Sequence, residues 1–295
     1  MSDTPQIVTR VPTLTPRPVD MHKGQAGRVS IIAGSTGMSG AAVLCGLAAL
    51  RGGAGLVRVL CPAPAQPIIA AAEPSLMTRP LPADAAGHLA GPTPDGAFDD
   101  ADVLAVGPGL GRAAGVSAAV AAAWHTFAGP LVLDADGLNA LAAGDAAVWG
   151  TRRGRPTILT PHPGELARIR ASLGQPGDDG PGDDARVVAA RGVATATGAV
   201  VVHKGHRTVV TDGPRVYINT TGNPGMATGG MGDVLTGLIA ALVGQGLAPF
   251  DAACLGVHVH GAAADHLAGR RGPFGYLARE VADTLPGVLR HHIGV

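Results

Sequence analysis

The chain has 295 residues, of which 46% are hydrophobic and 15% charged, so it contains enough apolar material for a large buried core. Aromatic residues make up only 3%, and we therefore expect a core built from Ala, Val, Leu and Ile. The formal net charge is zero, which argues against a protein that binds DNA or RNA through the phosphates of the nucleic acid.

The N-terminal part of the sequence changes character near residue 28. Residues 1–20 include four prolines and are expected to form an arm without a core of its own. A β-rich run follows at 29–33, then a Gly-Ser-Thr-Gly turn, a helical stretch at 39–51 and, after a glycine break, a second strand at 56–60. This order of strand, turn, helix and strand is typical of a βαβ unit.

The same alternation continues through the middle of the chain. Strands are predicted at 103–106, 131–133, 157–159 and 199–202, and helices at 113–127, from 138, around 166–169 and after an acidic, Gly-rich loop at 174–184. A hairpin is predicted from 207–211 and 215–219, which flank Asp212-Gly213. From residue 231 the chain is expected to be helical, with one proline-marked break.

No shift in composition marks a second domain, so residues 21–295 are predicted to form one α/β domain. Strands that alternate with helices indicate a mostly parallel sheet covered by helices on both faces. Ligands of such sheets bind outside the carboxyl ends of the strands. The predicted Gly- and Asp-rich turns should therefore line one crevice.

We expect neither a secreted nor a membrane-spanning protein, and no fold stabilised by a structural metal or by disulfides. The first ten residues lack the apolar core of a signal peptide, and the most apolar helix-like stretch, 41–50, is too short to cross a bilayer. The three cysteines, at 45, 61 and 254, form no CxxC pair, so neither a zinc ribbon nor a disulfide framework is predicted. We expect a reduced, cytoplasmic protein that forms a homo-oligomer.

The turn whose residues are best suited to take part in catalysis is Thr228-Gly229-Gly230-Met231-Gly232-Asp233, which opens an apolar helix at 234–243. Glycines let backbone N–H groups approach an anion, and the helix N-terminus adds a favourable dipole. Asp233 would then lie beside a bound phosphate and could take a proton from an attacking hydroxyl. The alternative is that Asp233 only caps the helix, although a cap does not require three glycines.

Two further turns offer charged groups at strand ends. Lys204-Gly205-His206-Arg207-Thr208 carries donors that suit a nucleotide phosphate, but a solvated basic turn has the same composition. Asp134-Ala135-Asp136-Gly137-Leu138-Asn139 places carboxylates where Mg²⁺ or a ribose hydroxyl could be held. Asp136 could equally be the N-cap of the following helix.

Thr160-Pro161-His162-Pro163-Gly164-Glu165 holds His162 between two prolines, whose locked φ removes backbone freedom. Pro163 can be the first residue of a helix and Glu165 its third. A rigidly held polar residue at a strand end favours contact with a ligand. Two other patterns carry little weight: 107–111 resembles a dinucleotide fingerprint only loosely, and metal binding by the i, i+2 pair at 258 and 260 is improbable.

Together these motifs resemble those of the NAD(P)H-hydrate dehydratases, the carbohydrate-kinase-like family that repairs hydrated nicotinamide cofactors. The resemblance covers about residues 20–290 and implies a ribokinase-like fold, a single α/β domain whose central sheet has eight or nine strands. It rests on an ordered set: Lys23-Gly24, Gly27-Arg28, Ala33-Gly34-Ser35, Met38-Ser39-Gly40-Ala41-Ala42, Val106-Gly107-Pro108-Gly109-Leu110-Gly111, Asp134-Ala135-Asp136-Gly137-Leu138-Asn139, Thr160-Pro161-His162-Pro163-Gly164-Glu165 and Gly229-Gly230-Met231-Gly232-Asp233-Val234-Leu235.

The resemblance implies an ADP-dependent dehydration of (6S)-NAD(P)H hydrate to NAD(P)H, with AMP and phosphate as co-products. The C6 hydroxyl is phosphorylated from ADP or ATP with Mg²⁺, and phosphate then leaves as the ring nitrogen supplies electrons. By the same resemblance, Asp233 is the catalytic base, and Glu165 contributes indirectly to the binding of Mg²⁺. The implied ligand contacts are Lys204, Gly205, His206, Arg207, Thr208 and Gly232 for the nucleotide, and Ala41, Gly109, His162 and Asp233 for the hydrated cofactor.

Two alternatives remain open. A small-alcohol kinase of the hydroxymethylpyrimidine or hydroxyethylthiazole type shares the fold and the base, but the pyrimidine kinases have Asn where His162 stands. A non-catalytic nucleotide sensor is disfavoured by the intact Gly232-Asp233 pair. Many bacterial relatives carry an N-terminal epimerase domain, whereas only about twenty residues precede the kinase-like unit here, so we expect no epimerase activity.

Overall fold

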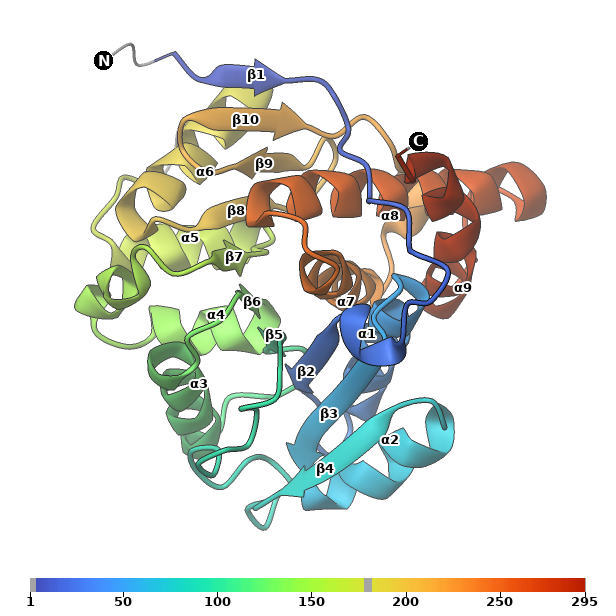
Figure 1. Cartoon of the computed structure of the whole chain (residues 1–295). Helices are drawn as coiled ribbons and strands as arrows, with labels where there is room; N and C mark the ends of the chain where they lie inside the picture. The colour runs from blue at the N-terminus through green and yellow to red at the C-terminus, as the bar shows by residue number, and fades with distance from the viewer. Residues whose placement is uncertain (1–3, 178–181, 295) are drawn as a thin grey trace.

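The computed structural model describes residues 4–177 and 182–294 (Figure 1). Part of the loop predicted at 174–184 lies outside these residues. Within them, ten strands form one sheet in the order β1-β10-β9-β8-β7-β6-β5-β2-β3-β4. The strands are β1 (Gln6–Val8), β2 (Arg28–Ile32), β3 (Leu56–Pro62), β4 (Met77–Leu81), β5 (Val103–Val106), β6 (Leu131–Leu133), β7 (Thr157–Leu159), β8 (Val200–His203), β9 (Val209–Thr211) and β10 (Arg215–Ile218). The α-helices are α1 (Ser39–Arg51), α2 (Gln66–Ala72), α3 (Ala114–Thr126), α4 (Ala135–Ala142), α5 (Pro163–Ser172), α6 (Asp183–Thr197), α7 (Met231–Gly244), α8 (Pro249–Arg271) and α9 (Ala278–Leu289).

Most of the sheet is parallel. From β4 across to β8, each strand runs parallel to its neighbours. Strand β9 is antiparallel to both β8 and β10, and β1 closes the edge parallel to β10. These directions confirm the predicted α/β class and the hairpin around Asp212-Gly213. Because parallel strands end at the same edge of a sheet, the turns after β5, β6, β7 and β8 meet there.

Helices cover both faces of the sheet, as predicted (Figure 1). Helices α1, α7, α8 and α9 pack on one face, and α3 to α6 pack on the other. Side chains alternate between the faces along β6: Val132 joins the first cluster, while Leu131 and Leu133 join the second. A Cβ on Gly237 of α7 would lie 1.9 Å from the carbonyl oxygen of Cys45 on α1, so the close packing of these helices requires glycine there.

The two edges of the sheet contain elements that the sequence pattern did not predict. Strand β1 lies inside the predicted arm, and β4 follows α2 in a region without a predicted element. The described sheet therefore has ten strands instead of eight or nine. Strand β1 is only three residues long and β4 contains Pro80, which is tolerated at an edge because one side of such a strand has no partner.

Two predictions about the helices were wrong. The helix after β6 begins three residues earlier than predicted, at Ala135, so Asp134 occupies the N-cap position and Asp136 does not. The C-terminal region has two interruptions instead of one. The first precedes Pro249, which suits the first turn of α8, and the second begins at Gly272, whose φ of 121° ends that helix.

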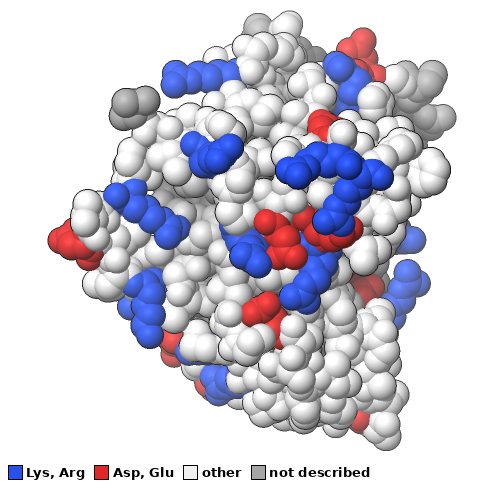
Figure 2. All heavy atoms as spheres, turned by 90° about the vertical axis from the view of Figure 1, so that its right-hand side faces the viewer, with Lys and Arg blue, Asp and Glu red and all other residues white. Residues whose placement is uncertain are grey.

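Acidic and basic side chains are intermixed on the face that carries α9 (Figure 2). An intermixed surface has no extended field of one sign, in line with the zero net charge. Within the part of the chain that the structure describes, no helix combines the length and the apolar character needed to cross a bilayer. Three ion pairs link α9 to its surroundings: Glu280 with Arg271, Asp283 with Arg51, and Arg279 with Glu73.

Candidate active site

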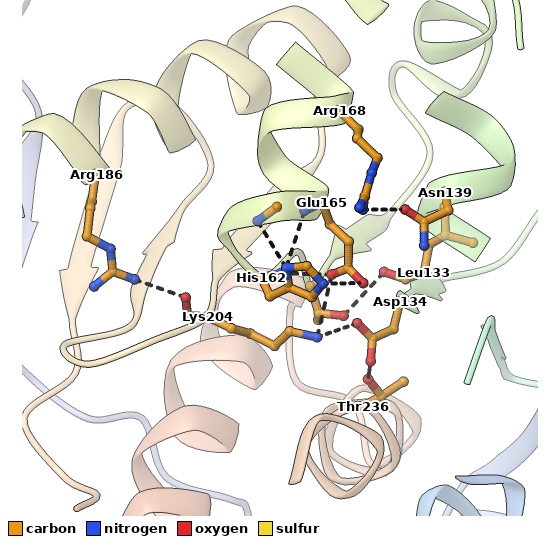
Figure 3. A network of polar contacts seen from close by, with 11 residues as sticks. Leu133, Asp134, Asn139, His162, Glu165, Arg168, Arg186, Lys204 and Thr236 are labelled. Carbon is orange, nitrogen blue, oxygen red and sulfur yellow. Dashed lines mark hydrogen bonds and ion pairs between the residues drawn. The ribbon is translucent and has the colours of Figure 1, made fainter. Parts of the chain in front are cut away.

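Polar residues from three adjacent strands meet at the carboxyl edge of the sheet (Figure 3). Asp134 follows β6, the 162–165 turn follows β7, and Lys204 follows β8. The N-terminal turn of α7 reaches the same place, since a Cβ built on Gly232 would lie 3.3 Å from the Nζ atom of Lys204. The fold therefore brings together three of the motifs that the sequence placed at strand ends and the glycine turn that opens α7.

Asp134 is the centre of this arrangement. Its side chain is 1% exposed, and its Oδ1 atom lies 2.6 Å from the Nζ atom of Lys204. Its other oxygen, Oδ2, accepts a hydrogen bond of 2.7 Å from the Oγ1 atom of Thr236, one turn after Asp233 on α7. Asp134 thus ties the end of β8 to the start of α7. Sequence reasoning did not single out Thr236, although its i+3 spacing from Asp233 places both on one helix face.

Lys204 is held in its charged form. Burial would lower the pKa of Lys204, but the nearby carboxylates of Asp134 and then Glu165 outweigh this and leave the pKa raised. The Nζ atom of Lys204 lies 3.9 Å from Glu165 Oε2. A permanent positive charge is thereby fixed beside the glycine turn of α7.

Glu165 and His162 form a capping box at the start of α5, with Pro163 as the first helical residue, as predicted. The Nδ1 atom of His162 accepts hydrogen bonds from the backbone N–H groups of Gly164 and Glu165, and the carboxylate of Glu165 accepts one of 2.8 Å from the N–H of His162. The Nε2 atom of His162 also lies 3.2 Å from Glu165 Oε1. Since the His162 side chain is 50% exposed, one face of its ring can still meet a ligand.

Asp233 is the third residue of α7, and the N-cap position is taken by Gly230 with a φ of 91°. The alternative in which Asp233 is the N-cap is therefore wrong. Burial raises the pKa of Asp233 to about 7, with further contributions from Asp134 and Asp136 and an opposing one from Lys204. A carboxylate with a pKa near neutrality is well suited to accept a proton.

The turn after β5 lies against the start of α1. A Cβ on Gly109, whose φ is 64°, would lie 2.8 Å from the Cβ of Ala41 and 2.7 Å from the carbonyl oxygen of Met38. The backbone oxygen of Gly109 also accepts a hydrogen bond of 2.8 Å from Ser35 Oγ. Ala41 and Gly109, both predicted substrate contacts, are thus direct neighbours, on the side of the site away from β8.

The predicted nucleotide turn is fastened from outside by Arg186 of α6, a residue that the sequence analysis did not consider. Its Nη2 atom donates to the carbonyl oxygens of His203 and Lys204 at 2.9 and 3.1 Å. Its Nη1 atom donates to those of His206 and Arg207. One guanidinium therefore bonds to three carbonyl groups of this turn and to that of His203, the last residue of β8.

Three side chains of the turn make contacts within the protein. Arg207, with a φ of 53°, pairs with Asp183, and the hydroxyl of Thr208 donates to the carbonyl oxygen of Gly205 at 2.9 Å. Lys204 is the member of the turn whose side chain reaches Asp134. Any contact of a nucleotide with the rest of the turn would therefore depend strongly on backbone N–H groups.

Carboxylates are close together here, yet they do not form a metal cage. Among the described residues, no three His, Cys, Asp or Glu side chains gather so that they could hold a metal ion. Asp134 is already paired with Lys204, and Glu165 with the backbone and ring of His162. A cation at this site would need ligands from a bound phosphate, as Mg²⁺ commonly does.

Comparisons with known proteins agree on one family. The family model described as "NAD(P)H-hydrate dehydratase" matches residues 29–287. The bifunctional NAD(P)H-hydrate repair enzyme Nnr of Moorella thermoacetica is 44% identical over 92% of this chain and 50% of its own. The ADP-dependent (S)-NAD(P)H-hydrate dehydratase of Neisseria meningitidis is 41% identical over 90% of this chain and 86% of its own. The chain thus spans about half the length of the bifunctional relatives.

Solved structures support the same fold. The ADP/ATP-dependent NAD(P)H-hydrate dehydratase of Bacillus subtilis, co-crystallised with ATP and Mg²⁺, superposes with a TM-score of 0.78 and 30% identity, covering 97% of this chain and all of the other. A hydroxyethylthiazole kinase from Pyrococcus horikoshii matches with a TM-score of 0.60 at 17% identity, covering 91% of this chain and 92% of its own. The second likeness shows the fold alone, which agrees with the ribokinase-like architecture expected from the sequence.

Proposed function

The chain belongs to the NAD(P)H-hydrate dehydratase family, and on that premise we propose that it repairs hydrated nicotinamide cofactors by ADP-dependent dehydration of (6S)-NAD(P)H hydrate. The observation that carries the proposal is the position of Asp233. Its carboxylate lies in the first turn of α7, its pKa is raised to about 7, and the Lys204 ammonium lies beside the same turn. A proton acceptor and an anion-binding turn are thereby adjacent.

The phosphates of ADP would lie at the N-terminus of α7. A Cβ built on Gly229 would meet no atom within 4 Å, so this turn is open to a ligand. Its backbone N–H groups and the Lys204 ammonium supply donors for an anion, and the helix dipole favours negative charge there. Mg²⁺, when bound with the nucleotide, supplies further neutralisation of the phosphate charge. Glu165 would act on it only indirectly.

The hydrated nicotinamide would lie between Asp233 and the neighbouring pair of Ala41 and Gly109. Asp233 takes the proton of the C6 hydroxyl while the hydroxyl oxygen bonds to the β-phosphorus of ADP. The bond from that phosphorus to the oxygen that bridges the two phosphates breaks and releases AMP. The C6–O bond then breaks with the electrons of the ring nitrogen, phosphate leaves, and loss of a C5 proton forms the C5–C6 double bond. Phosphorylation thus converts hydroxide, a poor leaving group, into phosphate.

The stoichiometry of the reaction tests this proposal. With Mg²⁺ present, we expect one AMP and one phosphate to form from ADP for each NADH regenerated from its hydrate. Absorbance at the reduced-nicotinamide band and chromatography of the nucleotides measure both sides. A reaction without ADP is the control, and NADH formation without AMP would exclude the phosphorylation route.

The Arg186 clamp leads to a prediction about nucleotide affinity. Arg186→Gln removes hydrogen bonds to three carbonyl groups of the 204–208 turn, which we propose binds ADP, and one to the carbonyl group of His203 just before it. The KM for ADP should rise about tenfold, as expected for the loss of hydrogen bonds from a charged donor, while the KM for the hydrate changes little. Steady-state kinetics with each substrate varied in turn measure this.

Arg191→Gln provides the matched control, because Arg191 lies on the same helix but donates to the carbonyl oxygen of Gly213 in the hairpin turn. It should leave the KM for ADP near that of the wild type. An equal loss of ADP affinity in both variants would show that α6 as a whole was disturbed.

A further inference from the structure

A pocket outside the described site lies between α3 and α4. It has a volume of about 220 Å³ and is lined in part by Gly111 and Arg112 before α3, by Asp136 and Asn139 of α4, and by Arg168 of α5. None of these residues was predicted to bind a ligand except Asp136, as one of two open alternatives. The pocket has two arginines in its wall and is open to solvent.

The pocket adjoins the candidate active site through the turn after β5 and the start of α4. Gly111 ends the turn that carries Gly109, and its N–H donates to Asp136 Oδ2 at 2.8 Å. Arg168 lies three residues after Glu165 on α5, and Asn139 lies three residues after Asp136 on α4. Three residues advance a helix by about 4.5 Å, so Arg168 and Asn139 lie roughly one turn along α5 and α4 from the residues that begin these helices at the carboxyl edge of the sheet.

The charges in the pocket favour an anion. The acidic member, Asp136, already accepts the Gly111 N–H group. Arg168 donates one hydrogen bond of 2.9 Å to Asn139 and keeps further N–H groups (Figure 3). Arg112 is exposed and bonds to no other residue in the described part of the chain. Guanidinium groups bind phosphate through two parallel hydrogen bonds, a geometry that favours them over lysine at such sites.

We propose that this pocket is a subsite for the phosphate groups of the hydrated dinucleotide, with Arg112 and Arg168 as the binding residues. The inference rests on the proposed function. Only one ribose separates the nicotinamide ring from the nearest phosphate of the dinucleotide, so a ring held at Asp233 needs an anion site a short distance away. The volume is below the roughly 300–1,000 Å³ of a full ligand pocket, and therefore suits one part of the dinucleotide.

The test uses Arg112→Gln, Arg168→Gln and the double variant of the whole chain. Each single change should raise the KM for the hydrate about tenfold without changing kcat or the KM for ADP, because the interaction is the same in the ground and transition states. Titration with NADPH, whose phosphates are those of the hydrate, should show the same loss of affinity without turnover. Arg270→Gln, near the end of α8 on the opposite face of the sheet, is the control and should change neither value.

The two hydrates distinguish the phosphate that is bound. Equal losses with hydrated NADH and NADPH would identify the pyrophosphate, whereas a loss confined to hydrated NADPH would identify the 2′-phosphate, and either supports the subsite. Unchanged KM and NADPH affinity in both arginine variants, or a raised KM for ADP instead, would overturn it. A wild-type protein that binds NADPH but does not convert its hydrate would contradict the proposed function, and the NADPH affinities of the arginine variants would then decide the subsite by themselves.

Discussion

Asp233→Asn is expected to lower kcat by about 10²- to 10⁴-fold while ADP still binds, since this is the usual cost of removing a positioned general base. An amide cannot accept the proton of the C6 hydroxyl. The change is nearly isosteric, and the N-cap of α7 is Gly230, so the start of the helix should survive. Loss of a negative charge beside the phosphates should leave ADP affinity equal or tighter. Measuring kcat and ADP affinity on one preparation decides the matter, and turnover within a few-fold of wild type would remove Asp233 from the mechanism.

The same variant should be more stable than the wild type above neutral pH. The pKa of Asp233 is raised in the folded protein from an ordinary value of 3.8 to about 7. The folded state therefore binds the proton more tightly than the unfolded state, and this contribution to stability is lost as the pH rises from about 4 through 7. Asn carries no such charge. Thermal unfolding at pH 8 should show a higher Tm for Asp233→Asn, with the difference shrinking toward pH 4.

The raised pKa also predicts how turnover depends on pH. Because the base acts only when it is ionised, kcat/KM should rise with pH and level off above about 7. The negative charge of Asp134 contributes to this raised pKa. Asp134→Asn should therefore move the midpoint of the profile to lower pH in whatever activity remains. A profile that is flat between pH 5 and 8 would contradict the assignment of Asp233 as the base.

Lys204→Met is expected to have the largest effect on stability. It leaves the Asp134 carboxylate, 1% exposed, without its cation at 2.6 Å. Removing one partner of a buried ion pair costs about 3–5 kcal/mol, because the other charge stays buried and unpaired. The cost here should be at the lower end of that range, since the Lys204 side chain is 18% exposed. Urea unfolding of the variant against the wild type measures it.

The double variant Asp134→Asn, Lys204→Met provides the control for this prediction. With neither charge present, no uncompensated ion remains, and Thr236 can still donate to the side-chain oxygen of Asn at position 134. The double variant should therefore be more stable than Lys204→Met alone, and the cycle of four proteins gives the coupling energy. Simple additivity of the two single losses would show that the pair is not coupled. ADP affinity should be weak in both variants that lack Lys204.

Much of the architecture could be predicted from the sequence, because it is encoded locally. The strands at 103–106, 131–133 and 157–159 were predicted with the bounds that the structure has, since each is a short, mainly apolar run ended by a turn rich in Gly, Asp or Pro. The start of α5 at Pro163, with His162 before it, follows from the same local chemistry. The edge strands β1 and β4 could not be predicted, because their short or proline-containing segments become strands only by pairing with a neighbour.

The sequence by itself determined the fold class, the family and the set of turns that face one crevice. Only the tertiary structure decided which residues of that crevice contact one another and how they change one another's pKa values. Asp134 lies 70 residues from Lys204 and 102 from Thr236, and Arg186 bonds to carbonyl groups 17 to 21 residues away. Burial and the distances to neighbouring charged side chains set the pKa of Asp233. Both depend on the arrangement of the chain in space, which no periodicity or motif along the sequence contains.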